Sequence, residues 1–540
     1  MISTEMLAKT KAMIDGMKSV CADAGLANDS SEYKIITEAF LYKFLNDKFL
    51  HDVASIRQIP ASTSTDAYFS ALTSEEREDL ELELPDTAII RPEYLISALF
   101  NRKEEEGISR LLDDAMLGIA ADNADVFSVR TGTGASIKLF GGISRFLIEE
   151  NKRDAFAAAL LELLVGFSFE STFDQKYDFF ANVFEYLISD YNKDSGTYGE
   201  YFTPHSIATI IARILVPEGT KNVTVYDPAA GTGTLVLAAA HQIGEQNCTI
   251  YTQDRSQKAN EFMRLNLILN NLVHSLPNVY HDDTLVSPRH VLPNGQLRHF
   301  DYIVSNPPFK CDFSSTRDEL AGEAYKARFW AGVPNVPPRK PEKMAIYVMF
   351  LQHIISVLKE GGKAAVVVPT GFLTAKAKIE LGIRKRLIDQ GMLRGVISMP
   401  SNIFANTGTN VSVIFIDSSK KYDHALLMDA SSLGEKKKVD GKNQRTYLSQ
   451  EEIERIIAVF NACEEQEDFS VLASYEDIAQ KKYSFSAGQY FEVKLDYVDI
   501  TPAEFDEKLS ELMDNLQKMF AEGDELQKSI LAQLKGLHYE

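Results

Sequence analysis

The residues with the clearest chemical potential lie in the segment FDYIVSNPPF, residues 300–309. Its apolar part is typical of a buried strand, and the strand must end at the prolines because proline cannot donate to a sheet ladder. The amide oxygen of Asn306 and the carbonyl of Pro307 are two acceptors for an exocyclic NH2 group, and Pro308 helps to fix the backbone direction. Phe309 offers a ring on which a planar base can stack, worth ~1–3 kcal/mol per base.

This segment predicts methyl transfer to a conjugated amine. Two acceptors direct the lone pair of the nitrogen at an electrophilic methyl group, so catalysis would consist mostly of orientation and placement. No covalent enzyme intermediate is needed, and we interpret Cys311 as a bystander. A target base in duplex DNA would have to swing out of the stack, at a cost of about a few kcal/mol.

A cofactor site is predicted at three further strand ends. Asp227 ends a strand, and Gly231 and Gly233 allow a tight turn before a helix. Asp254 follows the next strand at the interval expected for a ribose-binding carboxylate. Asp283 ends a third strand and is placed to reach an adenine amine. An aspartate before the glycine loop would repel a pyrophosphate but attract an ammonium or sulfonium group, so the site favours a zwitterionic nucleoside over NAD.

The elements that must position these residues form an alternating pattern. Seven short β-rich runs alternate with helical segments, which predicts a mainly parallel sheet with helices on both faces, an α/β fold. Residues 1–165 are expected to form a helical N-terminal domain, residues 166–480 the sheet domain, and residues 481–540 a helical tail. The seven runs are residues 222–227, 249–254, 278–283, 300–306, 362–369, 393–400 and 410–417.

The C-terminal tail has the pattern of a long amphipathic helix. Thr501, Pro502 and Glu504 form a helix start with a capping carboxylate. Apolar residues then recur at spacings of three and four, with an interruption at Gly523. The helix would pack either on the core of its own chain or against a helix of a partner, and the sequence leaves both open.

Composition limits the possible partners. The formal net charge is −21, whereas proteins that bind DNA alone usually carry a basic surface. A nucleic-acid substrate would therefore need a basic partner or a locally basic cleft. Candidate phosphate contacts are Lys376, Lys378, Arg384, Lys385 and Arg386, with a solvated helix face as the alternative, and Arg339, Lys340 and Lys343.

The cellular setting is also constrained by composition. The 4 cysteines are scattered without metal-ligand spacing, which argues against a zinc site or a disulfide framework and favours a reducing cytoplasm. No apolar run of about 18 residues is present, so we expect no membrane span.

Several segments together resemble a known family. DPAAGTGT (227–234), SNPPF (305–309) and GEYFTP (199–204) resemble, in gamma order, the signature motifs of class I N6-adenine DNA methyltransferases. The segments at 32–49, 183–191 and 483–490 resemble the modification subunit, HsdM, of type I restriction–modification systems. The resemblance spans nearly the whole chain and implies a class I Rossmann-like methyltransferase fold.

The resemblance also implies roles for particular residues. Asn306 to Phe309 would bind the target adenine, and S-adenosyl-L-methionine would be the cofactor. Asp227 and the loop of Gly231, Thr232, Gly233 and Thr234 would hold its amino-acid end, Asp254 its ribose and Asp283 its adenine. The residues around its methionine part would be Glu200, Tyr201, Phe202, Thr203, Pro204 and His205.

The implied partners explain the acidity of the chain. Double-stranded DNA would be read by a separate specificity subunit, clamped by two modification subunits, and a restriction subunit is a further partner that the family allows. Three alternatives remain: a stand-alone DNA adenine methyltransferase, a protein glutamine N5-methyltransferase with the same Asn-Pro-Pro logic, and a non-catalytic assembly protein.

Overall fold

The computed structural model describes residues 4–27, 30–60, 62–84, 87–124, 129–130, 136–137, 140–170, 173, 186, 203–404, 409–419, 422–439, 443–491 and 501–535. The chain divides into two compact units, Met1–Tyr490 and Phe491–Glu540. The predicted site residues Glu200, Tyr201 and Phe202 lie outside the described residues. None of the described helices is long and apolar enough to cross a membrane.

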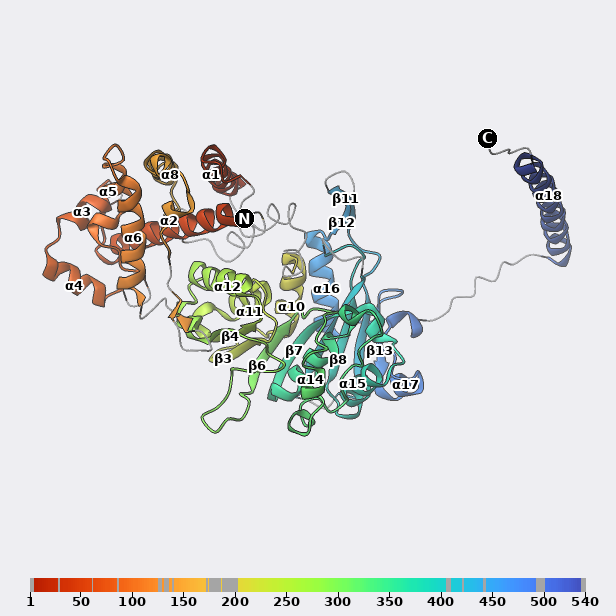
Figure 1. Ribbon diagram of the computed structural model, residues 1–540. Coiled ribbons are helices and arrows are strands. Elements are labelled where there is room, and N and C mark those ends of the chain that lie inside the picture. Colours follow the sequence, from red (N-terminus) through yellow and green to blue (C-terminus); the bar gives the residue numbers. More distant parts are fainter. Residues whose placement is uncertain are drawn as a thin grey trace. The chain divides into compact units, whose positions relative to one another are not determined.

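The first unit begins with a helical region, as the sequence predicts (Figure 1). Aromatic residues of its second helix, Phe40, Tyr42 and Phe44, are buried. The ring of Tyr33 lies 5.0 Å from that of Phe262, so the helical region packs directly on the α/β part. The elements are α1 (Thr4–Asp23), α2 (Ser30–Ile56), α3 (Thr65–Ala71), α4 (Ser74–Leu82), α5 (Ile96–Phe100), α6 (Ile108–Asp122), α8 (Arg153–Val165), and a short hairpin of β1 (Val129–Arg130) and β2 (Ser136–Ile137).

A nine-stranded sheet follows, with the order β13-β10-β8-β9-β7-β6-β3-β4-β5. All seven predicted runs are strands: β3 (Val223–Asp227), β4 (Cys248–Asp254), β5 (Val279–His281), β6 (Phe300–Ser305), β7 (Leu358–Pro369), β8 (Leu393–Ser398) and β9 (Val411–Asp417). The sheet is wider than the predicted seven strands because β10 (His424–Asp429) and β13 (Ser470–Ser474) extend it beyond β8.

The sheet is mostly parallel. β3 pairs in parallel with β4 and with β6, and β6 pairs in parallel with β7. β9 runs antiparallel to both of its neighbours, β7 and β8, so β8 points the same way as β7, β6 and β3. The carboxyl ends of these four strands therefore share one edge of the sheet.

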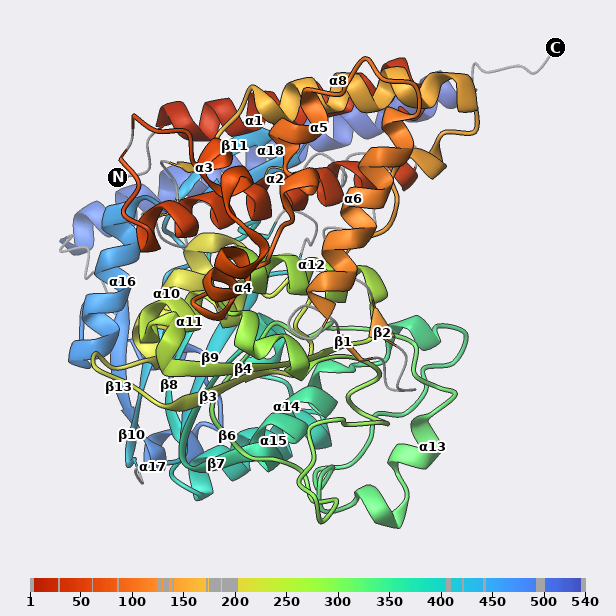
Figure 2. The same cartoon turned by 90° about the vertical axis from the view of Figure 1, so that its left-hand side faces the viewer.

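Helices cover both faces (Figures 1 and 2). α10, α11, α12 and α16 lie on one face, and α14, α15 and α17 on the other. Their bounds are α10 (His205–Leu215), α11 (Thr234–Ile243), α12 (Gln257–Leu269), α14 (Tyr347–Val357), α15 (Lys378–Asp389), α16 (Gln450–Ala462) and α17 (Tyr475–Gln480), with the short α13 (Arg317–Leu320) in the segment between β6 and α14.

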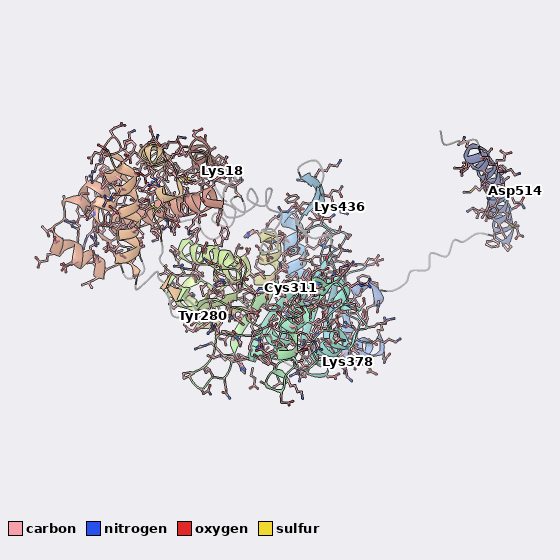
Figure 3. All side chains as sticks on the ribbon, viewed as in Figure 1. Lys18, Tyr280, Cys311, Lys378, Lys436 and Asp514 are labelled. Carbon is pink, nitrogen blue, oxygen red and sulfur yellow. The ribbon has the colours of Figure 1, made fainter. Side chains whose placement is uncertain are left out.

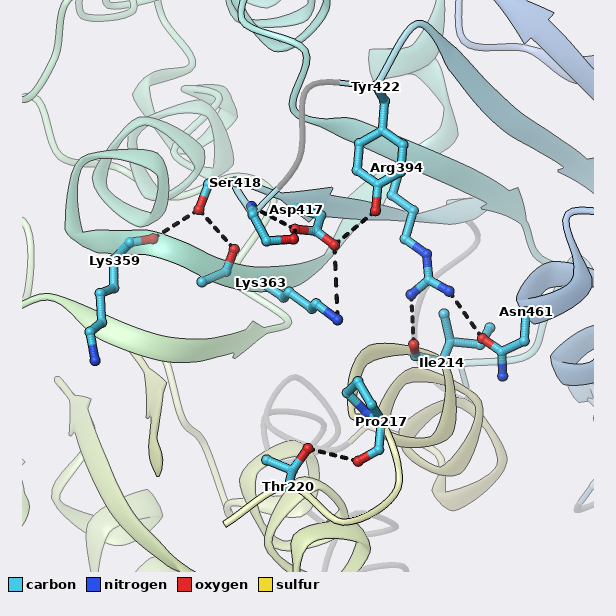
Figure 4. A network of polar contacts seen from close by, with 12 residues as sticks. Ile214, Pro217, Thr220, Lys359, Lys363, Arg394, Asp417, Ser418, Tyr422 and Asn461 are labelled. Atoms are coloured by element: carbon cyan, nitrogen blue, oxygen red, sulfur yellow. Dashed lines mark hydrogen bonds and ion pairs between the residues drawn. The ribbon is translucent and has the colours of Figure 1, made fainter. Parts of the chain in front are cut away.

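Polar contacts fasten the sheet edge opposite the strand ends that carry the predicted site (Figure 4). The buried carboxylate of Asp417 accepts a hydrogen bond from the hydroxyl of Tyr422 at 2.9 Å and faces the ammonium of Lys363 at 3.9 Å. Arg394 of β8 donates to the carbonyl of Ile214 in α10 and to the side chain of Asn461 in α16. These contacts hold two helices to one strand.

The second unit contains α18 (Pro502–Lys535), a helix of 34 residues with no buried residue. Its first turn is capped as predicted, because Glu504 accepts hydrogen bonds from the backbone N–H and hydroxyl of Thr501 at 2.8 and 2.9 Å. The predicted long helix is confirmed, and it runs through Gly523, where the apolar spacing is interrupted. A single glycine costs a helix about 1 kcal/mol, which the surrounding good helix formers offset.

Candidate functional site

A cavity of about 320 Å³ opens where the strand order reverses. The chain proceeds from β3 outward to β4 and β5, then crosses back to place β6 on the other side of β3. Such a switch point leaves a crevice at the carboxyl ends of the strands, where ligands of α/β proteins bind. The lining residues that the sequence predicts are Thr203, Asp227, Gly231, Thr234, Asp254, Asp283, Asn306 and Pro308.

The carboxylate of Asp227 links the two central strands. It is 1% exposed, and its Oδ1 accepts hydrogen bonds from the hydroxyl of Ser305 at 2.8 Å and from the backbone N–H of Ala229 at 2.9 Å. Burial raises the pKa of Asp227 to about 7, against the lowering effect of these two hydrogen bonds. A cationic ligand group that enters the cavity would stabilise the ionised form.

The glycine loop is fastened to the next strand through Asp254. Its Oδ2 accepts a hydrogen bond from the backbone N–H of Gly231 at 2.8 Å, and its Oδ1 accepts one from that of Ser256 at 2.7 Å. Burial raises the pKa of Asp254, while these bonds oppose the shift. Each carboxylate oxygen keeps a second lone pair, so the group can still accept hydroxyl donors.

The backbone conformation at position 233 favours glycine, and a side chain there would also displace the end of Met263. The φ of Gly233 is +90°, and a Cβ built there would lie 2.4 Å from the terminal methyl of Met263. Gly233 precedes the first residue of α11, so the loop delivers the chain directly to a helix N-terminus. Thr232 is buried, and its carbonyl accepts a hydrogen bond from Asn266 of α12 at 2.7 Å.

The third acidic residue lies in a tight turn after β5. Oδ1 of Asp283 accepts a hydrogen bond from the backbone N–H of Leu285 at 2.9 Å. The hydroxyl of Thr284 donates to the carbonyl of Pro228 at 2.6 Å. This contact ties the turn to the segment just after Asp227, so three strand ends are joined around one cavity.

Asn306 meets a residue from far upstream in the sequence. Its Nδ2 donates a hydrogen bond to the hydroxyl of Thr203 at 3.1 Å. Thr203 is buried and also lines the cavity. Because the amide nitrogen is held by Thr203, the amide oxygen is the free end of the group and can accept from an amine.

Other predicted residues support the cavity without lining it. Pro307 is buried, and Phe309 is half-buried against the hydrophobic core. Pro204 precedes α10, and His205 is its first residue. Gly233 and Thr232 lie behind the lining residues Gly231 and Thr234 in the same loop.

Sequence reasoning missed several lining residues: Pro228, Ala229, Ala230, Leu235, Arg255, Ser256, Thr284, Lys310, Cys311, Ile346 and Phe350. Three of these directly follow a predicted residue in the sequence, namely Arg255, Thr284 and Lys310, and Ser256 lies two positions after Asp254. Their closeness to predicted residues could have identified them. Cys311 lines the cavity and accepts a hydrogen bond from Arg255 at 3.4 Å, and its interpretation as a bystander in the chemistry stays a prediction. Ile346 directly precedes α14 and Phe350 lies in its first turn, and no motif marks them.

One predicted phosphate contact is wrong. Arg384 is 1% exposed, and its guanidinium donates to the carbonyls of Tyr483, Phe372 and Ala375. It therefore fastens α15 to neighbouring loops. Arg386 is half-buried with its guanidinium 4.2 Å from the ring centroid of Trp330. Lys376, Lys378 and Lys385 are exposed, as are Arg339, Lys340 and Lys343, and their contact with phosphates stays a prediction.

Fold and site define a class: an α/β protein with a switch-point cavity that joins a glycine loop, acidic strand ends and an oriented Asn-Pro-Pro-Phe segment. The family model for N-6 DNA methylases matches residues 175–496. The chain belongs to this family.

The similar proteins are consistent with that membership. The chain is 26% identical over 445 residues to the type I restriction enzyme MpnII methylase subunit of Mycoplasma pneumoniae, covering 79% of this chain and 78% of that one. It is 26% identical over 457 residues to the HindI methylase subunit of Haemophilus influenzae, covering 80% and 94%.

A solved structure shares the fold. The type I restriction-modification system methyltransferase subunit from Streptococcus thermophilus aligns with a TM-score of 0.70 at 22% identity, over 90% of this chain and 100% of that chain.

Proposed function

We propose that this chain is the modification subunit of a type I restriction–modification enzyme. It transfers the methyl group of S-adenosyl-L-methionine to the N6 amine of an adenine swung out of duplex DNA. The observation that carries the proposal is the oriented amide of Asn306 at the rim of a cavity that also contains Asp227 and Asp254.

The groups that line the cavity suit the proposed cofactor in charge. S-adenosyl-L-methionine has an ammonium, a ribose and an adenine, and the cavity offers Asp227, Asp254 and Asp283 at successive strand ends. The glycine loop leaves main chain open to a ligand beside the N-terminus of α11. The bound cofactor would supply a methyl group activated by a sulfonium.

The residues of the chain would supply orientation. The Oδ1 of Asn306 and the carbonyl of Pro307 accept the two N6 hydrogens of the adenine, which turns the nitrogen lone pair out of conjugation. The amide nitrogen donates to Thr203, so the amide oxygen is the group that would face the amine. A half-buried Phe309 at the same strand end and Pro308 at the cavity provide apolar surface for the base. Orientation of this kind supplies much of the barrier reduction in group transfer.

The acidity of the chain supports a complex in which this subunit transfers the methyl group and another subunit recognises the DNA. With a net charge of −21, the chain has little general affinity for phosphates, so sequence reading falls to a specificity subunit, with two modification subunits for each such subunit. A restriction subunit completes the complex where one is present. A glutamine N5-methyltransferase would orient the NH2 group of its substrate in the same way, but the family match and the similar proteins favour DNA as the substrate.

The test is methyl transfer from labelled S-adenosyl-L-methionine to duplex DNA, first by the purified chain and then with its co-purifying partners. Products are digested to nucleosides to locate the methyl group. N6-methyladenine that appears only with a partner supports the proposal. N6-methyladenine made by the chain alone would make it a stand-alone enzyme, and methylation of a protein amide without DNA methylation would overturn the proposal.

A further inference from the structure

A basic β-ribbon stands apart from the main sheet. It consists of β11 (Glu435–Val439) and β12 (Asn443–Tyr447), which pair only with each other. Three consecutive lysines, Lys436, Lys437 and Lys438, are exposed on β11, and Arg445 lies on β12. The labelled Lys436 lies on this ribbon, away from the main sheet (Figure 3). So dense a basic group is notable in a chain of net charge −21.

One face of the ribbon places like charges opposite each other. Lys437 is the direct cross-strand partner of Arg445. Both lie over the ring of Tyr447, with the ammonium 5.9 Å and the guanidinium carbon 5.2 Å from its centroid. Like charges directly opposite destabilise a strand pair, and Lys437 also forms an exposed pair with Glu435 at 2.9 Å. An anion bound over this face would be attracted by both cations.

The opposite face also carries cations. Alternation along β11 places Lys436 and Lys438 on this face, opposite Thr446 and Gln444. Among the described residues, no carboxylate forms an ion pair with either lysine. The ribbon therefore presents positive charge from both faces, which suits an extended polyanion better than a single small anion.

The ribbon is anchored at the catalytic edge of the sheet. Thr446 is buried, its N–H donates to the carbonyl of Asn402 at 3.0 Å, and its hydroxyl donates to that of Ser401 at 2.6 Å. Ser401 and Asn402 follow the carboxyl end of β8, which points the same way as β6 and Asn306. Three strand spacings of ~4.8 Å separate β8 from β6, or about 14 Å, well within one turn of a DNA duplex.

We infer that the β11–β12 ribbon binds the sugar–phosphate backbone of the DNA duplex beside the site of methyl transfer. The inference rests on the proposed function for its substrate. The ribbon supplies the local positive charge that an acidic subunit needs to hold a duplex at its cavity, and a two-stranded ribbon is narrow enough to follow a groove. Its contacts are to phosphates and carry no sequence information.

The salt dependence of DNA binding tests this inference. The double variant Lys436→Gln/Lys438→Gln is compared with the parent, each purified with its co-purifying partner, on a labelled duplex of mixed sequence. Each phosphate contact contributes about 0.9 to the slope of log K against log salt. If both contacts are lost, we expect this negative slope to become less steep by roughly 1.8. The affinity for the cofactor should stay unchanged.

A matched variant controls for loss of charge alone. Lys221→Gln/Lys359→Gln removes two exposed cations at the opposite edge of the sheet, near the amino ends of β3 and β7, and should leave the slope at the parental value. Because Lys359 also pairs with Asp301 at 2.6 Å, thermal unfolding of this control is measured as well. An unchanged slope in the ribbon variant, with its thermal unfolding unaltered, would overturn the inference.

A third outcome would show that the ribbon binds a protein and not DNA. If the ribbon variant loses its co-purifying partner, the ribbon is a protein interface and the DNA assignment fails. Failure of the proposed function is distinguishable, because the parent complex would then produce no N6-methyladenine whatever the ribbon does.

Discussion

The amide of Asn306 donates a hydrogen bond to the hydroxyl of Thr203 at 3.1 Å, between residues that are 103 positions apart in the sequence. We expect this contact to hold the amide of Asn306 in one orientation. An asparagine amide presents oxygen or nitrogen depending on its flip, and only the oxygen can accept from an amine. With its nitrogen directed at Thr203, the amide leaves its oxygen for the amine that the proposed chemistry needs.

Replacement of Thr203 should therefore affect turnover more than binding. Thr203→Val removes the acceptor while keeping the shape, and we expect kcat to fall about fivefold, since one hydrogen bond contributes about 1 kcal/mol. Thr203→Ser keeps the hydroxyl and should retain most of the activity. Single-turnover methyl transfer and cofactor titration separate the two effects. Equal activity of the valine and serine variants would show that Thr203 does not orient Asn306.

Removal of the amide itself is the stronger change. Asn306→Ala should abolish detectable methyl transfer but leave cofactor affinity within a few fold, because Asn306 is placed to contact the target amine. Methyl transfer is measured with labelled cofactor, and affinity by calorimetry. Parallel loss of both, in a variant that unfolds at the parental temperature, would contradict this role.

Asp254 should matter for cofactor binding in two ways. Asp254→Ala removes a proposed acceptor for ribose hydroxyls and also the hydrogen bond that holds the N–H of Gly231 at 2.8 Å. Each hydrogen bond contributes about 0.5–1.5 kcal/mol, so the loss of both should raise the dissociation constant by roughly five- to 150-fold. Asp254→Asn keeps a side-chain oxygen that can accept from one N–H. Its dissociation constant should therefore lie between those of the parent and of Asp254→Ala. A dissociation constant that does not change in Asp254→Ala refutes the ribose assignment.

The pKa of Asp227 predicts a pH dependence. Burial raises it from 3.8 to about 7, so the neutral form contributes stability that is fully present below the ordinary pKa and lost as the pH rises through about 7. An ammonium ligand needs the ionised form instead. Cofactor affinity should therefore increase as the pH rises through about 7, and each unit below that value should weaken binding up to about tenfold.

Asp227→Asn provides the comparison for this effect. Its carboxamide cannot ionise, so cofactor binding should be weak and nearly independent of pH, although it keeps an acceptor for Ser305 and Ala229. Calorimetric titrations from about pH 6 to about pH 7.5 cover the range in which an α-amino group stays mostly protonated. A flat pH profile in the parent would rule out Asp227 as the titrating group.

The C-terminal helix makes a separate prediction. Along α18 the exposed apolar residues recur at helical spacing: Phe505, Leu509, Leu512, Leu516, Phe520, Leu526, Ile530 and Leu534. We expect truncation before Thr501 to release the specificity partner, because helix-in-groove docking needs such a face. Co-purification of tagged full-length and truncated chains measures this. Undiminished recovery of the partner after truncation would favour a helix that packs on its own chain.

Much of the fold followed from local patterns. The seven core strands lie where runs of β-branched residues end in turn signals, since a strand buried on both faces must be apolar along its whole length. The glycine loop, the acidic strand ends and the Asn-Pro-Pro-Phe segment were likewise readable, because their chemistry depends on residue type and short spacing. The two outer strands were missed, since β10 and β13 lie in a region of mixed, acidic composition.

Long-range geometry decided the rest. The sequence by itself determined which residues could do chemistry: Asn306, Asp227 and Asp254 each end a strand with a recognisable local signal. Only the tertiary structure decided that Thr203 contacts Asn306, that Cys311 lines the cavity and that Arg384 is buried. Such contacts join residues from separate elements, and they depend on how a parallel sheet brings distant strand ends to one edge, which no local spacing encodes.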